Sequence, residues 1–537
     1  ISTVTGGLFI GVFKKFKARG WHNLTIKIGV IVAEDCNEGW IENLLDCLYG
    51  RQWLAFVAID RTSRVSRSAH YAWGIRAYFN WDARRNAHVL PVSSTKSWES
   101  WLENVADSLL VGLVHYRSGQ ALPECNVILD LAGNSSTEHA VACALWRLDP
   151  CPVQSSAARG VVLERIMMHQ TTSTLKLVSR SVDSTHVIDQ RSIRLDLNSP
   201  ARSVADLGKA AVGLVADNLV RWQRARIEPE SSSVVVSEPP KGGKPTTLGV
   251  ALMLVRRVQD RRRQRDVRRQ WSVATLNLTL APDSANWHEP PLHMDIADPF
   301  PVWVDGRLYV FVESMDLNHG RGQISVFTDV DQQGFVAPQV VLERPFHLSF
   351  PVVFEHKGVW FMVPEQSESG RVSLYRNTRF PDEWVFERDL LPDFSGLDTV
   401  PLWHDDRWWL FTTARSGTNI DNNLHIFHAN SLDAEFQPLA VNPVKSSLGS
   451  SRMAGHFFRQ NDQLIRPAQN GCRTYGGGIV LNRVDQLTVN AYKETQVKTL
   501  DPFLPPYLEG LHTLNYAGDI ALVDGVRRLP GQGSRWR

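Results

Sequence analysis

Apolar and polar positions follow two different periods in the two halves of the chain. Before residue 228, short apolar runs typical of buried strands alternate with stretches of helical spacing. The strand patterns are Ile26–Val32, Leu54–Ile59 and Val127–Leu131, and the helical patterns are Trp40–Leu48 and Val204–Trp222. Strands that alternate with helices predict a parallel sheet with crossover helices, so we expect residues 24–227 to form a Rossmann-like α/β domain.

Two short segments of different composition follow this region. Residues 228–247 are rich in Pro, Ser and Gly, which predicts a linker. Residues 248–270 have helical spacing and carry eight Arg between Arg256 and Arg269. A solvated or interdomain docking face is one interpretation of this basic helix. Contact with an anionic membrane surface or a phosphate-bearing substrate is the other.

From Trp271 onward the pattern changes to strands of period two, and a repeat of about fifty residues emerges. Five segments read strand, polar turn, strand: residues 297–313, 349–365, 398–413, 454–469 and 510–525. Hairpins repeated around an axis bury one another, so five copies predict an all-β five-bladed propeller over residues 271–526. The alternative is a large β-sandwich.

The repeat also predicts which side chains meet at the propeller axis. The position three residues before Pro301, Pro351 and Pro401 holds Asp298, Leu348 and Asp398. Counting back in the same way from Gly455 gives Arg452, and in the fifth segment Glu509 or His512 lies nearby. We therefore expect Asp298, Asp398 and Arg452 to gather at one mouth of the propeller.

Further polar residues lie in apolar surroundings of the same region. They are His347, Ser349, Glu365, Asn423, His456, Arg466 and Gln469, with Tyr475 in the glycine-rich loop 470–478. A buried charge is costly unless paired, so these residues either pair with one another or face a polar ligand. The loop is expected either to close on a ligand or to use its glycines for tight turns.

Two carboxylates facing one pocket are what glycosidic chemistry requires. Asp298 is then the base or nucleophile, and Asp398 or Glu365 is the acid. The alternative is that these carboxylates cap turns at the mouth.

Composition and net charge argue against several classes of protein and of binding site. The formal net charge of +2 gives no reason to expect a nucleic-acid partner. The six Cys include no CxxC pair, so neither a disulfide framework nor a zinc site is predicted, and no metal or cofactor is expected. No apolar run reaches the roughly 18 residues of a membrane span. We expect a cytoplasmic protein, with peripheral attachment at the inner membrane as an alternative.

The quoted segments resemble known families. Residues 297–313 look like the first blade of glycoside hydrolase family 43, which implies a general base at Asp298 and the acid position at Asp398. Leu348 stands where that family has a third carboxylate. Residues 270–525 are similar to the N-terminal propeller region of glucosamine inositolphosphorylceramide transferases, whose transferase domain follows the propeller. Because the sequence ends at Arg537, we do not expect transferase activity to carry over directly. Residues 26–227 more weakly resemble a degenerate formyltransferase-like domain.

These patterns favour a carbohydrate-active protein of glycan or glycolipid biosynthesis. The propeller mouth is expected to bind a carbohydrate or nucleotide sugar, with glycosyl transfer or hydrolysis as the reaction. One alternative is a formyl or acyl transferase that acts on an amino sugar through the N-terminal domain. The other is a non-catalytic interaction protein.

Overall fold

A computed structural model describes residues 246–530 except 265–266, 329, 332–333, 336 and 416–422. Of the preceding chain it describes residues 26–33, 44, 54–62, 73–85, 115–116, 127–131, 144–149, 162–168, 170–180, 185–197 and 199–225. The chain divides into two compact units, residues 1–254 and 255–537. The predicted linker lies outside the described residues as far as residue 245, and the predicted helix Trp40–Leu48 lies outside them apart from Leu44.

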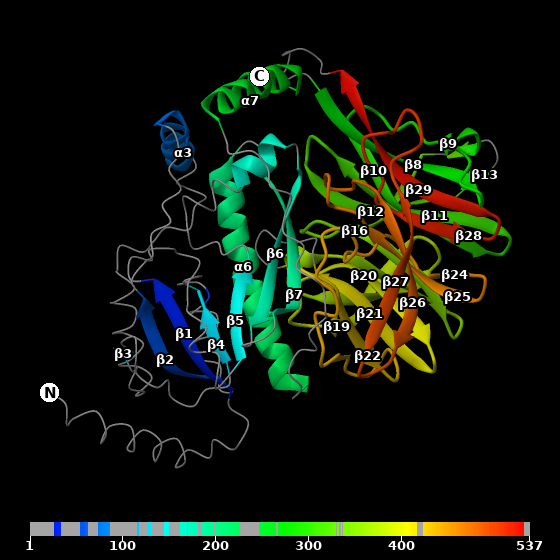
Figure 1. Ribbon diagram of the computed structural model, residues 1–537. Coiled ribbons are helices and arrows are strands. Elements are labelled where there is room, and N and C mark those ends of the chain that lie inside the picture. Colours follow the sequence, from blue (N-terminus) through cyan, green and yellow to red (C-terminus); the bar gives the residue numbers. More distant parts are fainter. Residues whose placement is uncertain are drawn as a thin grey trace. The chain divides into compact units, whose positions relative to one another are not determined.

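The first unit contains a seven-stranded sheet in the order β3-β2-β1-β4-β5-β6-β7 (Figure 1). Neighbouring strands are parallel from β3 to β5, and the last two pairings are antiparallel. The strands are β1 Ile26–Ala33, β2 Leu54–Thr62, β3 His115–Tyr116, β4 Val127–Asp130, β5 Ala144–Asp149, β6 Thr172–Arg180 and β7 Thr185–Arg194. The three strands predicted here are therefore present, and their pairing is parallel as expected.

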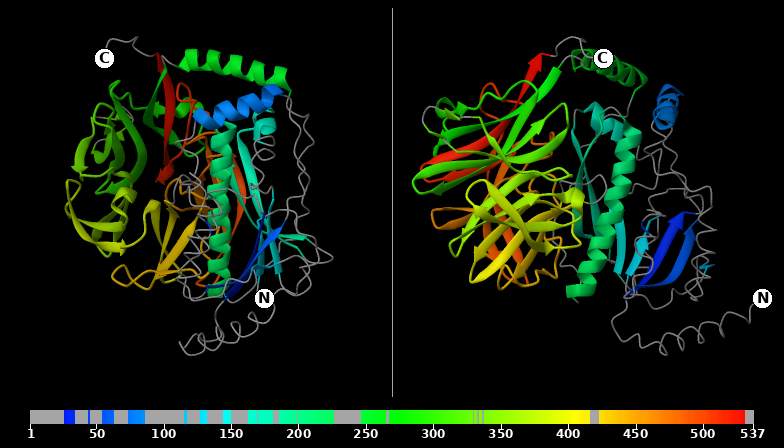
Figure 2. Two further views of the ribbon diagram at one scale, coloured as in Figure 1. Left: turned by 90° about the vertical axis from the view of Figure 1, so that its left-hand side faces the viewer. Right: turned by 180° about the vertical axis from the view of Figure 1, so that it is seen from behind.

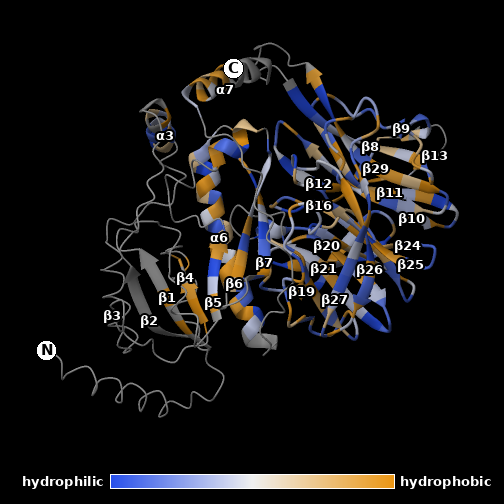
Figure 3. Ribbon diagram, viewed as in Figure 1, coloured by the Kyte–Doolittle hydropathy of each residue, from blue (hydrophilic) through white to orange (hydrophobic). Residues whose placement is uncertain are grey.

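Helix α6, Pro200–Ala225, packs against this sheet. Its apolar positions recur along one side, which Figure 3 shows as orange segments between blue ones. Leu207, Leu214 and Leu219 are buried in one hydrophobic core with the central strands. Helix α3, Trp73–Arg85, contacts α6, and Asp82 of α3 accepts a hydrogen bond from the Ala201 N–H in the first turn of α6.

Helix α7 spans Thr247–Gln264, and strand β8, Val267–Asn277, begins three residues later. The predicted helix over residues 248–270 is therefore too long. Arg268 and Arg269 lie in β8, where they pair with strand β29. The side chains of Arg256 through Arg265 lie outside the described part of the chain, so contact with an anionic surface stays a prediction. Among the described residues, no helix is both long and apolar enough to cross a membrane.

The second unit contains five four-stranded antiparallel sheets, which are the five blades predicted from the repeat (Figure 2). The first blade is β10 Met294–Val304, β11 Arg307–Asp316, β12 Arg321–Phe327 and β15 Gln339–Leu342, with a small hairpin of β13 Val330–Asp331 and β14 Gly334–Phe335. The second is β16 Ser349–His356, β17 Val359–Glu365, β18 Val372–Arg379 and β19 Glu383–Leu391. The third is β20 Gly396–His404, β21 Arg407–Ala414, β22 His425–Ala429 and β23 Gln437–Pro438.

The fourth blade is β24 Phe458–Gln460, β25 Gln463–Gln469, β26 Ile479–Leu487 and β27 Tyr492–Leu500. The fifth combines β28 Leu514–Ala517 and β29 Ile520–Pro530 with β8 and β9 Asn286–Trp287, which come before the first blade in sequence. The ring is thus closed by hydrogen bonds between distant parts of the chain. Phe300, Phe350 and Val400 of the inner strands are buried in one hydrophobic core, so the centre of the propeller below the strand starts is filled with side chains.

Candidate functional site

The inner strands of three blades share one backbone irregularity. The last regular pairs before it are Ala297 with Glu313, Ser349 with Glu365 and Leu397 with Thr413. The next residue in each strand is left-handed, with φ of 53° at Asp298, 45° at Phe350 and 46° at Asp398. Such angles are uncommon for residues other than glycine and cost energy, so three equivalent occurrences mark a constrained position that the surrounding structure must stabilise.

This register corrects the sequence alignment of the second blade. Alignment on proline placed Leu348 at the position of the two aspartates, whereas the structure places Phe350 there. Pro351 therefore corresponds to Pro299. The ring of Phe350 packs edge-on against Phe300 with centroids 4.8 Å apart, and Phe350 is 1% exposed. An aromatic ring thus fills the place that a carboxylate takes in the first and third blades.

Asp298 is buried and accepts hydrogen bonds from two neutral donors. Its Oδ1 accepts a hydrogen bond from Thr513 Oγ1 at 2.8 Å, and its Oδ2 accepts one from the Phe350 N–H at 3.1 Å. Burial raises the pKa of Asp298 to about 7. His512 opposes this rise, while other carboxylates, including Asp398, reinforce it. Asp298 therefore exchanges its proton near neutral pH.

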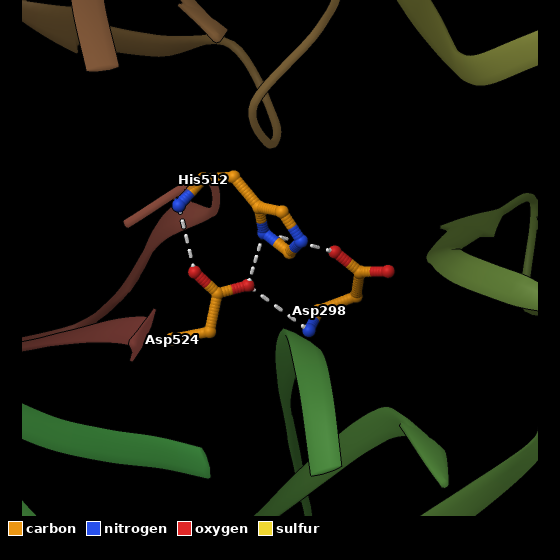
Figure 4. A group of neighbouring side chains, drawn as sticks. All are labelled: Asp298, His512 and Asp524. Atoms are coloured by element: carbon orange, nitrogen blue, oxygen red, sulfur yellow. Dashed lines mark hydrogen bonds and ion pairs between the residues drawn. The ribbon is translucent and has the colours of Figure 1, made fainter. Parts of the chain in front are cut away.

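The fifth blade holds Asp298 in place through His512 and Asp524 (Figure 4). Asp524 Oδ1 accepts the backbone N–H groups of His512 and Thr513 at 2.9 and 3.0 Å. Asp524 Oδ2 lies 2.5 Å from His512 Nδ1 and accepts the Asp298 N–H at 3.3 Å. His512 Nδ1 also lies 3.6 Å from Asp298 Oδ1. One buried imidazole therefore stands between two buried carboxylates.

The contacts among Asp298, His512 and Asp524 determine the charges of His512 and Asp524. Burial would lower the pKa of His512, but Asp524 and Asp298 outweigh it and raise the pKa to about 9. Burial would raise the pKa of Asp524, but His512 and the two backbone N–H groups hold it below its ordinary value. His512 and Asp524 thus form a buried ion pair at neutral pH.

The third and fourth blades meet at Asp398 and Arg452. Arg452 donates from Nε to Asp398 Oδ2 at 2.6 Å and from Nη2 to Oδ1 at 3.2 Å. Gln469 donates to the same Oδ2 at 2.6 Å. All three of these contacts are N–H groups that donate to Asp398, and none of them could accept a hydrogen bond from a protonated carboxyl group. The arrangement therefore fits the ionised form of Asp398. The predicted meeting of Asp398 with Arg452 is thus present, and Gln469 joins them.

Two glutamates occupy equivalent positions on the second strands, where Glu313 pairs with Ala297 and Glu365 pairs with Ser349. Glu365 accepts hydrogen bonds from Ser349 Oγ at 3.3 Å and from the Ser367 N–H at 3.1 Å. Arg452 Nη2 lies 3.8 Å from Glu365 Oε2, which links the second blade to the fourth. Glu313, which the sequence analysis did not single out, lies 3.2 Å from Nε2 of the predicted residue His347.

Aromatic rings cover the side of the site formed by the fourth and fifth blades. Trp271 stacks on His512 with centroids 4.1 Å apart. The ring of Tyr475, 38% exposed, lies 5.4 Å from the guanidinium of Arg452 and meets His512 edge-on. Loop 470–478, which holds Tyr475, is fastened by the Asn470 N–H to Gly478 O and the Leu511 N–H to Gly476 O. Gly476 and Gly478 have φ of 62° and 154°, so these glycines serve the turns of the loop, and closure on a ligand stays a prediction.

Three predicted contact residues point elsewhere. Arg466 is fully buried and binds Glu494 with two hydrogen bonds of 2.7 Å. Asn423 makes two hydrogen bonds with the backbone of Ala414. The ring of His456 packs edge-on against Phe300 in the core, and burial lowers its pKa to about 4. The contacts of these three side chains are with other parts of the propeller, so a role in ligand binding stays a prediction for them. In the text below, the mouth means Asp298, Glu313, Glu365, Asp398, Arg452, Gln469, Tyr475, His512 and Asp524.

One group of described residues has the ligand types and spacing of a metal site. Asp298, His512 and Asp524 each offer one atom within 4.8 Å of the others. However, His512 Nδ1 is already engaged with Asp524 Oδ2 at 2.5 Å, and a bound ion would have to displace this contact. The geometry therefore fits an ion pair better than a metal site.

Most residues of the mouth lie in a part of the chain that matches a known family model, whereas His512 and Asp524 follow that part. Residues 248–501 match the model of the N-terminal region of glucosamine inositolphosphorylceramide transferase 1. The transferase of this name from Oryza sativa subsp. japonica is 32% identical over 236 residues, which cover 42% of this chain and 31% of the relative. That from Arabidopsis thaliana is 31% identical over 209 residues, 38% of this chain and 27% of the relative. The resemblance predicted from the sequence is confirmed over this region. The chain spans about a third of the length of these relatives.

Solved structures similar to this chain include glycoside hydrolases. A family 117 glycoside hydrolase of Zobellia galactanivorans has a TM-score of 0.34 and 13% sequence identity, over 48% of this chain and 90% of its own. The catalytic domain of a Coprinopsis cinerea family 62 α-L-arabinofuranosidase has a TM-score of 0.34 and 12% identity, over 48% and 96%.

Proposed function

We propose that the mouth is a carbohydrate-binding site and that the protein acts in glycan or glycolipid biosynthesis. The observation that carries the proposal is the convergence of polar side chains from all five blades on one point. Asp298 and Glu313 come from the first blade, Glu365 from the second and Asp398 from the third. Gln469 comes from the fourth blade and His512 from the fifth. The relatives named for a glycolipid transferase support a role in the same branch of chemistry.

The residue types suit a sugar ring. Carboxylate oxygens accept hydrogen bonds from hydroxyl groups, and each carboxylate oxygen has more than one lone pair. The partly exposed ring of Tyr475 offers an apolar surface to the C–H face of a sugar. Small-molecule sites combine an aromatic wall with a few placed polar groups in this way.

The environments of the two axial aspartates also support distinct roles in proton transfer. Asp298 titrates near neutral pH, whereas Asp398, whose pKa burial also raises, accepts hydrogen bonds from Arg452 that favour its ionised form. Pairs of carboxyl groups whose environments differ in this way commonly divide acid and base roles. For glycosyl transfer or hydrolysis at this mouth, Asp298 is then the group that exchanges the proton. The sequence analysis had made Asp298 the base or nucleophile and had given the acid role to Asp398 or Glu365.

The proposal is tested by sugar binding to the full chain with Asp298 altered. A panel of simple sugars and glycans is screened by saturation-transfer NMR, and hits are measured by calorimetry. Asp298→Asn should abolish or strongly weaken binding while the fold is retained.

Asp305→Asn is the matched control, because Asp305 is exposed, left-handed like Asp298, and lies just beyond the far end of the same strand. Equal loss of binding in both variants, or unchanged binding in Asp298→Asn, would remove the mouth from the function.

A further inference from the structure

The charges of the mouth point to the chemistry of its ligand. Its five carboxylates are Asp298, Glu313, Glu365, Asp398 and Asp524. Among the described residues, the basic side chains in contact with them are Arg452, His512 and His347. With both histidines charged and Asp298 protonated, four carboxylates still face three cations. With Asp298 ionised, the excess of negative charge is larger.

Each of these cations is already committed to a carboxylate. Arg452 makes two hydrogen bonds to Asp398, and its outer nitrogen lies 3.8 Å from Glu365. The Nδ1 of His512 lies 2.5 Å from Asp524. Arg452 and His512 are 5% and 3% exposed, so they have little room to turn toward a second anion. A phosphate bound here would have to compete with carboxylates for every positive charge.

Asp298 and Glu365, by contrast, are held mainly by neutral donors. Asp298 accepts from the hydroxyl of Thr513 and the Phe350 N–H. Glu365 accepts from the hydroxyl of Ser349 and the Ser367 N–H. Hydroxyl groups of a sugar can add to such contacts without any new charge, whereas an anion would meet these carboxylates in a buried setting where repulsion is strong.

We infer that the mouth accepts an uncharged sugar residue and rejects ligands that carry phosphate or carboxylate, including the diphosphate of a nucleotide sugar. This inference rests on the proposed function and narrows it. The sequence had left carbohydrate and nucleotide sugar open as partners. The excess of buried carboxylates decides between them in favour of the free or glycosidically linked neutral sugar.

Matched pairs of sugars test this inference. The full chain is titrated calorimetrically with glucose and glucuronate, galactose and galacturonate, and mannose and mannuronate, at low salt. At least one neutral sugar should bind, and its uronate should bind at least about tenfold more weakly because like charges meet in the site. Uridine diphosphate and pyrophosphate should leave the affinity for the neutral sugar unchanged.

Variants of one glutamate show where the discrimination arises. Glu365→Gln should reduce the preference for the neutral sugar over its uronate, because one repelling charge is removed. Glu355→Gln should leave the preference intact, since Glu355 is exposed at the other end of the same hairpin. Equal affinity for a uronate, or displacement of the sugar by pyrophosphate, would overturn the inference and leave sugar binding standing. Failure of every sugar to bind would instead overturn the proposed function.

Discussion

Arg452 of the fourth blade binds Asp398 of the third, and the effect of its removal on the stability of the propeller can be calculated. Arg452→Met keeps an unbranched side chain of similar length but removes both hydrogen bonds to Asp398. Asp398 is 2% exposed and would retain Gln469 as its remaining donor among the contacts described above. Burial already raises the pKa of Asp398, and Arg452 opposes that rise. Without Arg452 the pKa rises further, and Asp398 takes up a proton in the folded propeller.

The free-energy cost follows from proton linkage. In the unfolded chain Asp398 ionises near its ordinary pKa of about 3.9. While it stays protonated in the fold, unfolding releases a proton, and stability falls by about 1.4 kcal/mol for each pH unit above that value. In the wild type, burial of Asp398 already costs part of this free energy. We therefore expect a net loss in the free energy of unfolding of about 3 kcal/mol at pH 7, as for other broken buried ion pairs. The loss should nearly vanish below about pH 4, where both states are protonated.

The assay must report on the propeller alone, because the chain has two compact units. Pulsed hydrogen exchange read by mass spectrometry, on peptides covering β20 and β25, gives urea midpoints at several pH values. Arg459→Met is the matched control, since Arg459 is an exposed residue of the same blade. The double variant Arg452→Met, Asp398→Asn should recover much of the loss. A loss below about 1 kcal/mol, or one independent of pH between 4 and 7, would refute the reasoning.

Three further results are expected. Asp524→Asn should weaken sugar binding and lower the thermal midpoint of the propeller. The variant puts an amide N–H₂ group where Asp524 Oδ2 accepts from His512 Nδ1 and from the Asp298 N–H, so a donor replaces an acceptor. Wild-type sugar affinity in this variant would show that Asp524 does not position Asp298. The pKa of His512 is about 9 in the fold against 6.5 as its ordinary value, so its stabilising effect is complete below pH 6.5 and is lost as pH rises through 9. Urea midpoints of β29 peptides should fall over that range, and His512→Gln should flatten the curve. Gly476→Ala should lower both thermal midpoint and sugar affinity, because Gly476 has φ of 62° and a Cβ there would lie 2.7 Å from Trp271; an unchanged midpoint would contradict the packing described.

The five blades could be predicted from the sequence because each hairpin repeats one pattern of strand, polar turn and strand. The register within a blade could not. Alignment of Pro351 with Pro301 shifted the second blade by two residues, because the first blade has two prolines after the left-handed residue and Pro299 is the true counterpart of Pro351. Only the hydrogen-bonded pairs of the sheet reveal that Phe350, and not Leu348, takes the axial position.

The sequence pattern did not show which face of a strand each predicted site residue occupies. Arg466 and Gln469 lie three positions apart on β25, so their side chains point to opposite faces, and only Gln469 reaches Asp398. Asp524 was missed, although a single carboxylate within the apolar run of β29 was a usable signal. Its partner Asp298 is 226 residues away in sequence, and no local pattern joins them. The formyltransferase-like resemblance of residues 26–227 stays a prediction.

Hydrogen exchange with and without a bound sugar tests the central claim most directly. Full-length protein is incubated with the neutral sugar that binds most tightly, and exchange is compared peptide by peptide. The account predicts protection at the starts of the inner strands, in peptides around Asp298, Asp398, Arg452 and His512, and no protection at the hairpin turns around Asp305 and Asp405. Protection confined to the outer strands, or to the first unit, would contradict it.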